Sequence, residues 1–236
     1  MQQRDVFVPS ARRSFLSRFG AALAAAGATF GAGAVSMTAQ GASDQRWQPT
    51  RHAEDDWYDK VPGKHRTILD AVSGQGVGDA LHFASNILTT SKSGYGLDSG
   101  DLAVVICLRH GATAFAFADP MWAKYSEPMS SHAKFTDPKT KAPAVVNAYN
   151  SAEYRGLLAN GPTTIDSLIK QGVHFAVCAQ STHGYAGDFA RRTNGTADAI
   201  YKELTSNLIG NSHMVPSGIV AVGHAQEHGY AYVYTG

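Results

Sequence analysis

Apolar and polar residues alternate along this chain in blocks that predict strands and helices in turn. Continuous apolar runs predict buried strands over Thr67–Val72, Asp101–Leu108 and Val173–Val177, with shorter strands over His213–Val215 and Tyr230–Tyr234. Apolar residues at helical spacing predict helices over Val77–Thr90, Thr164–Gln171, Ala197–Leu208 and Gly218–Glu227. The alternation predicts an α/β domain with a mostly parallel sheet and helices on both faces.

Glycine, proline and small polar residues mark the boundaries between these elements. Ser73–Gly78 reads as a glycine-rich turn between a strand and a helix, and its spacing does not match a phosphate-binding loop. Ser93–Leu97 is expected to be a loop and Gly184–Asp188 a turn. Thr163–Asp166 fits a capping box at a helix start, with aspartate in place of glutamate.

One long segment, Asp119–Asn150, breaks the rhythm of strands and helices. It contains four prolines and several lysines, together with Met121, Trp122, Tyr125 and Met129. Loops of this length in a compact domain are usually functional covers or interaction surfaces. We interpret residues 119–150 as an insertion that either covers the strand ends or contacts another subunit, and that is less ordered than the sheet.

The N-terminus has the composition of an export signal. Paired arginines, Arg12 and Arg13, precede a weakly hydrophobic Ala/Gly stretch from Phe19 to Val35. That stretch is too short and too weakly apolar for a good membrane span, although a retained N-terminal anchor is the alternative. Residues 1–42 are therefore expected to be a twin-arginine signal that sends the protein to the periplasm or otherwise out of the cytoplasm, with small-residue cleavage motifs at 34–36 and 39–41.

The remaining residues are enough for one domain. We divide them into a polar lead-in, 43–65, which carries Trp47, Trp57 and Tyr58, and a folded domain, 66–236. The formal net charge is +1, so the composition gives no reason to expect binding to nucleic acid or to an anionic membrane. Two cysteines permit a single disulfide at most.

The candidate chemistry centres on Cys178, which closes the predicted strand Val173–Val177. Ligands and reacting groups collect at the carboxyl ends of strands in open α/β sheets. Residues Ala179–His183 are expected to begin a helical turn whose amides point at the sulfur and favour its thiolate. The alternative is that Cys178 is a small buried hydrophobic residue, as we expect for Cys107, which lies inside an apolar run.

Two histidines are candidates to assist Cys178. His110 follows a strand that is a candidate neighbour of the Cys178 strand, and His183 lies five residues after the cysteine, so either fits as a cation or a proton acceptor. Both also fit ordinary surface positions. His224 and His228 are four residues apart on a predicted helix, but no third ligand is identifiable and no metal or cofactor is predicted. No Gly-x-Ser-x-Gly elbow indicates a hydrolase.

Three segments together give the chain a resemblance to a known family. Leu108–Gly111, Lys170–Cys178 and Gln226–Ala231 occur in the order and approximate spacing of DsrE/DsrF/TusD-like proteins of sulfur relay. The resemblance implies a three-layer α/β/α fold with about five strands and assembly into homo-oligomers. It also implies that Cys178 accepts sulfur as a persulfide, from a donor protein or on the way to an acceptor protein.

Two hypotheses of different classes follow from these observations. The first is an exported DsrE-like protein that handles sulfur through Cys178, assisted by His110 or His183. The second is a non-catalytic module of the same fold that binds a small ligand, a metal ion or a partner, with Cys178 inert. The reactivity of Cys178 in the folded protein separates them.

Overall fold

The computed structural model describes residues 48–236, which form one compact unit around a five-stranded parallel sheet. The strands are β1 (His65–Ala71), β2 (Leu102–Leu108), β3 (His174–Cys178), β4 (Ser212–Val215) and β5 (Ala231–Thr235). Their order in the sheet is β4-β3-β2-β1-β5, and every neighbouring pair is parallel. All five predicted strands are present, and the expected export signal lies outside the described residues.

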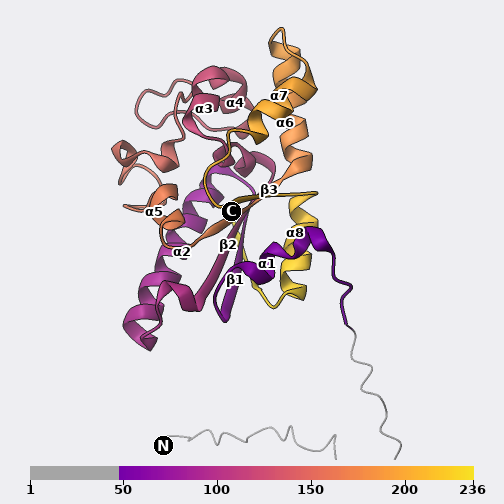
Figure 1. The fold of residues 1–236 in the computed structure, drawn as a ribbon. Coiled ribbons are helices and arrows are strands. Elements are labelled where there is room, and N and C mark those ends of the chain that lie inside the picture. Colours follow the sequence, from indigo (N-terminus) through magenta and orange to yellow (C-terminus); the bar gives the residue numbers. More distant parts are fainter. Residues whose placement is uncertain (1–47) are drawn as a thin grey trace, which may run out of the picture. The chain divides into compact units, whose positions relative to one another are not determined.

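Helices cover both faces of the sheet, so the predicted three-layer α/β/α architecture is confirmed (Figure 1). The α-helices are α1 (Trp57–Lys60), α2 (Gly74–Tyr95), α3 (Asp119–Lys124), α4 (Ser126–Ala133), α5 (Ile165–Ile169), α6 (Ala179–Arg192), α7 (Ala197–Thr205) and α8 (Gly218–Glu227). Short 3₁₀ helices are η1 (Ala53–Asp55), η2 (Ser99–Asp101), η3 (His110–Ala116), η4 (Ala148–Asn150) and η5 (Ala152–Tyr154). Within residues 48–236, none of these helices combines the length and apolar character needed to cross a membrane.

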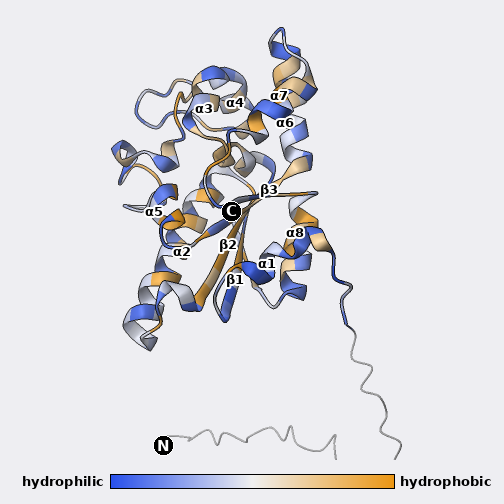
Figure 2. Ribbon diagram, viewed as in Figure 1, coloured by the Kyte–Doolittle hydropathy of each residue, from blue (hydrophilic) through white to orange (hydrophobic). Residues whose placement is uncertain are grey.

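The sheet separates two hydrophobic cores because successive side chains of a strand point to opposite faces. In β2, Val104 and Ile106 belong to the larger core, whereas Val105 and Cys107 belong to the smaller one. The larger core includes residues of α2, η3, α3, α4, α5, α6 and α7, and the smaller one includes residues of α1 and α8. Every residue of β2 is buried, as expected for a central parallel strand, and Figure 2 shows its hydrophobic character.

The polar lead-in is tied to the smaller core. Tyr58 is fully buried, and its hydroxyl donates to the carbonyl of Ala221 in α8 at 3.0 Å. Trp57 stacks on His213 of the edge strand β4, with ring centroids 4.0 Å apart. Residues 57–60 therefore complete the layer over this face, together with α8.

The glycine-rich segment Ser73–Gly78 is the start of a helix, not the turn that the sequence predicted. Ser73 caps α2 by accepting a hydrogen bond from the amide of Gly76 at 3.0 Å. A Cβ atom at Gly76 would lie 2.3 Å from the carbonyl oxygen of Thr235, and one at Gly78 would lie 2.8 Å from the hydroxyl of Tyr149. These glycines allow α2 to pack closely against β5 and η4.

The segment 119–150 is packed on the domain and is not devoid of regular structure. It contains α3 and α4, and its apolar residues Met121, Trp122 and Met129 are buried in the larger core. Asn147, also buried, donates through its side-chain amide to the carbonyl of Phe115 at 2.9 Å. Because helices of six and eight residues have weak periodic signals, the sequence pattern did not reveal them.

Two further boundaries differ from the sequence predictions. The cap of α5 is Thr164 with Ser167 as its reciprocal partner, one residue later than expected. The predicted turn Gly184–Asp188 lies inside α6, which runs without a break to Arg192. A Cβ atom at Gly184 would meet no atom within 4 Å, so this glycine is an exposed helix position rather than a turn signal.

Candidate functional site

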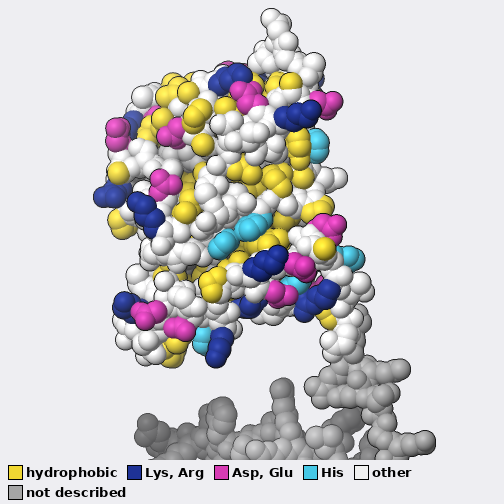
Figure 3. Space-filling model, in the orientation of Figure 1, with side chains coloured by type: hydrophobic (Ala, Val, Ile, Leu, Met, Phe, Trp, Pro, Cys, Tyr) yellow, Lys and Arg dark blue, Asp and Glu magenta, His cyan; other side chains and the backbone are white. Residues whose placement is uncertain are grey.

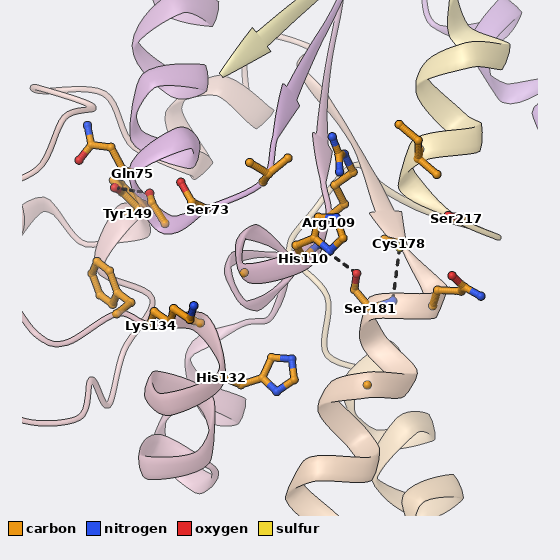
Figure 4. Close-up of a pocket in the computed structure, with 18 of the residues that line it drawn as sticks. Ser73, Gln75, Arg109, His110, His132, Lys134, Tyr149, Cys178, Ser181 and Ser217 are labelled. Carbon is orange, nitrogen blue, oxygen red and sulfur yellow. Dashed lines mark hydrogen bonds between the residues drawn. The ribbon is translucent and has the colours of Figure 1, made fainter. Parts of the chain in front are cut away.

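A cleft of about 930 Å³ opens at the carboxyl ends of β1, β2 and β3, where an α/β sheet places its ligands. Its walls come from the N-termini of α2, α6 and α8 and from the end of α4 (Figure 4). The lining residues are Val72, Ser73, Gly74, Gln75, Arg109, His110, Gly111, His132, Ala133, Lys134, Phe135, Tyr149, Leu158, Cys178, Gln180, Ser181, Gly184, Ser217 and Ile219. Cys178 and His110, predicted from different parts of the sequence, lie in this one cleft.

Cys178 joins β3 directly to α6 and serves as the helix N-cap. Its sulfur accepts a hydrogen bond from the amide of Ser181 at 3.3 Å, and its carbonyl accepts one from the hydroxyl of Thr182 at 2.9 Å. An amide donor at a helix N-terminus stabilises negative charge on the acceptor. The side chain is only 4% exposed, so a reagent must enter the cleft to reach the sulfur.

Ser181 connects Cys178 to His110. Its hydroxyl oxygen accepts a hydrogen bond from the backbone amide of His110 at 3.0 Å, while its own amide donates to the Cys178 sulfur (Figure 4). His110 has φ of 51°, in the left-handed region that costs energy for a residue with a side chain. The Ser181 hydroxyl thus holds the strained start of η3 next to the N-terminus of α6.

A buried ion pair supports the floor of the cleft below His110. The guanidinium of Arg109 donates from Nε and Nη2 to the two carboxylate oxygens of Asp70 at 2.7 and 2.9 Å. Tyr232 adds a third hydrogen bond to this carboxylate at 3.0 Å. Asp70 is fully buried, and its hydrogen bonds raise the pKa of Arg109 above its ordinary value.

Cys107 is a core thiol, as predicted. Its side chain is fully buried, and its sulfur donates to the carbonyl of Gly218 at 3.6 Å. Burial raises the pKa of this thiol well above its ordinary value, with the charge of Asp70 contributing in the same direction. Both cysteines are free thiols, and the strand register explains why they do not pair: Ala176, not Cys178, lies opposite Cys107.

The wall opposite Cys178 contains two residues that sequence reasoning did not select. His132 and Lys134 come from the end of α4, and both face the cleft (Figure 4). His132 packs on the ring of Tyr185 with centroids 4.0 Å apart, and its Nδ1 lies 3.8 Å from Asp188. Only the three-dimensional fold brings them to Cys178, because they belong to the segment 119–150, whose pattern gave no sign of a site.

His183 does not join this group. Its exposed ring stacks on Tyr201 of α7, with centroids 3.8 Å apart and planes 4° from parallel. The residues of α6 that line the cleft are Gln180, Ser181 and Gly184, and the helical repeat points position 183 away from them. Because the expected turn at Gly184 is absent, His183 remains on the far side of the helix.

The two histidines spaced four residues apart, His224 and His228, each lie beside a carboxylate. His224 lies 2.6 Å from the carboxylate of Asp55, and His228 lies 3.0 Å from that of Asp59. Across the described part of the chain, no group of three or more histidine, cysteine, aspartate or glutamate side chains is arranged to hold a metal ion. Figure 3 shows histidine and hydrophobic side chains together in the middle of one face, with a basic side chain beside them.

Comparisons with known proteins do not identify this site. No protein-family model and no curated protein matches the chain. Among solved structures, a protein of unknown function from Methanobacterium thermoautotrophicum matches with a TM-score of 0.35 and 15% sequence identity, over 72% of this chain and 99% of that chain. A likeness this distant carries no argument about function.

Proposed function

We propose that this protein carries sulfane sulfur as a persulfide on Cys178, as the resemblance to DsrE/DsrF/TusD-like relay proteins implies. The supporting observation is the position of the sulfur, which ends β3 and accepts the amide of Ser181 at the entrance of α6. A thiolate is the form that attacks sulfur, and an amide donor favours it. The same amide also stabilises the negative charge of the persulfide that forms.

The two cysteines differ in the way this role requires. Cys178 lines the cleft, whereas Cys107 is sealed in the smaller core and has a raised pKa.

The adjoining Arg109–Asp70 pair fixes the backbone end of β2, from which His110 enters the cleft. His110 and His132 are the side chains placed to exchange protons with the cleft contents.

Export is part of this proposal. A twin-arginine signal delivers folded proteins outside the cytoplasm, so Cys178 would receive sulfur after export, in an oxidising compartment. A cysteine recessed in a cleft is better protected there than an exposed thiol, and Cys178 is 4% exposed. The acceptor is proposed to be a partner protein, and the carrier itself a homo-oligomer, as in the family it resembles.

A second candidate function is supported by the low exposed fraction of Cys178. A thiol that is 96% covered can also be an inert part of the wall of a ligand-binding cleft, and a volume of about 930 Å³ fits a small molecule. In that case the domain is a binding module, and the hydrogen bond to the Cys178 sulfur serves only to cap α6.

Thiol labelling of the folded protein separates these two candidates. A small haloacetamide should modify Cys178 at neutral pH, because its sulfur lines the open cleft, and leave Cys107 unmodified until the protein unfolds. Peptide mass mapping identifies the modified residue, and the variant Cys178→Ser is the matched control. Labelling of Cys178 no faster than that of Cys107 would favour the binding module and count against the carrier.

A further inference from the structure

The cleft that leads to Cys178 carries an excess of positive charge. Its lining contains Arg109, His110, His132 and Lys134, and no aspartate or glutamate occurs among the residues of 48–236 that line it. The charge of Arg109 is matched by Asp70 below the floor. Lys134 forms no ion pair within that described range, so its ammonium charge stays available to a ligand.

The backbone adds to this positive field. The helices α2 and α6, of 22 and 14 residues, both begin at the cleft, with Gly74 and Gln75 lining it from one and Gln180 and Ser181 from the other. The unpaired amides of a helix N-terminus carry partial positive charge. Apart from the Ser181 amide, which donates to Cys178, these amides belong to residues that line the same cavity as Lys134, so their partial charges add to its field.

The size of the cleft and the depth of Cys178 restrict the donor. A volume of about 930 Å³ lies within the range of small-molecule sites, and it is several times larger than an inorganic sulfur anion needs. Because the Cys178 side chain is 4% exposed, a thiol on the surface of a folded protein would have to extend into the cleft to reach it. A small organic molecule meets both conditions without rearrangement.

We propose that the sulfur donor is a small organic hydropersulfide that bears a carboxylate, an inference that rests on the proposed sulfur-carrying role of Cys178. The sulfur end of the donor lies at Cys178, under the amide of Ser181. The carboxylate end lies toward Lys134 and His132 on the opposite wall (Figure 4). The positive lining favours an anionic donor. Because Cys178 and Lys134 lie on opposite walls, the donor must carry its persulfide at one end and its carboxylate at the other.

The transfer is balanced without a further oxidant or reductant. The Cys178 thiolate attacks the terminal sulfur of the donor R–S–SH, a new S–S bond forms on Cys178, and the S–S bond of the donor breaks. The electron pair of that bond leaves with R–S⁻, which takes a proton from water in the cleft. The products are the Cys178 persulfide and the thiol R–SH, and no net oxidation occurs.

The test compares two donors that differ in one charge. The full-length protein is incubated with the hydropersulfide of N-acetylcysteine, an anion, or with that of its uncharged methyl amide, and the rate of sulfur addition to Cys178 is followed by intact mass. We expect the anion to react about three- to tenfold faster at low ionic strength. This preference should fall toward one at about 1 M salt, where the screening length is about 3 Å.

The variant Lys134→Met assigns the preference to the cleft. Lys134 has φ of 51°, so methionine keeps the backbone cost of the native residue, and the anion preference should drop about two- to fivefold. Lys170→Met is the control, because Lys170 is exposed at the end of α5 and does not line the cleft. It should leave the preference unchanged.

The possible failures are distinguishable. Equal rates for the two donors, unaffected by salt or by Lys134→Met, would overturn the assignment of an anionic donor while leaving Cys178 as a sulfur carrier. Reaction with a protein persulfide and with neither small donor would overturn it as well. No sulfur on Cys178 from any donor would instead refute the proposed function on which this inference rests.

Discussion

Replacing Asp70 with asparagine tests the buried ion pair that supports the floor of the cleft. The carboxylate is fully buried and receives two hydrogen bonds from Arg109, at 2.7 and 2.9 Å, and one from Tyr232 at 3.0 Å. Asparagine keeps the shape but removes the charge, and it turns one acceptor into an NH₂ donor that faces the guanidinium. The variant therefore leaves Arg109 as a cation whose side chain is only 14% exposed and has no counter-charge in this pair.

The expected loss follows from the burial of both partners. Removing one partner of a buried ion pair costs about 3–5 kcal/mol, and the remaining exposure of Arg109 places this case near the lower end, at about 3 kcal/mol. For a domain of this size, that loss corresponds to a fall in Tm of about 6–12 °C. The double variant with Arg109→Met should recover about 1–2 kcal/mol of it, because the unpaired charge is then gone.

Equilibrium denaturation in urea, followed by circular dichroism, measures these differences. Asp56→Asn is the matched control, because Asp56 is exposed and its side chain makes no capping hydrogen bond, so the change should be below about 0.5 kcal/mol. A loss below about 1 kcal/mol for Asp70→Asn, or no recovery in the double variant, would refute the account of Asp70 as the buried counter-charge of Arg109.

Three further predictions concern packing, pH and export. Gly76→Ala should destabilise the domain by about 1–3 kcal/mol, because its Cβ would lie 2.3 Å from the Thr235 carbonyl oxygen. The control Gly94→Ala, whose Cβ would meet no atom within 4 Å, should stabilise α2 by about 0.5–1 kcal/mol. If Gly76→Ala were no more destabilising than Gly94→Ala, the close packing at Gly76 would be contradicted. Burial, and secondly the charge of His174, lowers the pKa of His213 to about 4. Between pH 6.5 and pH 4 this histidine is therefore protonated in the unfolded chain but not in the folded one, so stability falls as the pH falls. After discounting for solvent access, we expect a loss of about 1 kcal/mol over this range. His213→Gln should flatten the plot of Tm against pH between pH 6.5 and pH 4, and an unchanged slope would rule out His213 as the cause. Replacing Arg12 and Arg13 together by lysine should block export, which cell fractionation measures, and normal export of this variant would exclude a twin-arginine signal.

The sheet could be predicted because each of its strands carries a clear local signal. The run from Val104 to Leu108 is apolar at every position, as a strand buried on both faces must be, and β2 covers it. The helix predicted over Val77–Thr90 extends to Gly74 at its start and to Tyr95 at its end, where Gly96 adopts φ of 69°. Hydrophobic spacing locates elements well but gives their ends poorly, because caps and close contacts set the ends.

The wrong predictions occurred where tertiary packing overrides local sequence. Glycines at 184 and 187 suggested a turn, but α6 continues through them because Tyr185 and Phe189 anchor it in the larger core. Prolines and lysines in 119–150 masked the helices α3 and α4, whose Trp122 is fully buried in the larger core. Both outcomes depend on long-range contacts in the larger core, which local sequence patterns do not show.

The candidate site likewise contains residues that the sequence could predict and residues that it could not. Cys178 and His110 could be predicted to approach each other, because both follow parallel strands, and β3 and β2 are neighbours in the sheet. Asp70 carried a usable signal, since a carboxylate inside an apolar strand needs a counter-charge. Lys134 carried none, because its place in the cleft depends on how α4 packs.

The central claim is that Cys178 is the sulfur carrier, and adding sulfur to single-cysteine variants tests it most directly. The wild-type protein, Cys178→Ser and Cys107→Ser are incubated with an excess of a hydropersulfide donor and freed of small molecules, and their intact masses are measured. We predict the mass of one added sulfur atom on the wild type and on Cys107→Ser, and none on Cys178→Ser, because only Cys178 lines the cleft and accepts the Ser181 amide. Sulfur on Cys178→Ser, or on none of the three proteins, would contradict the claim.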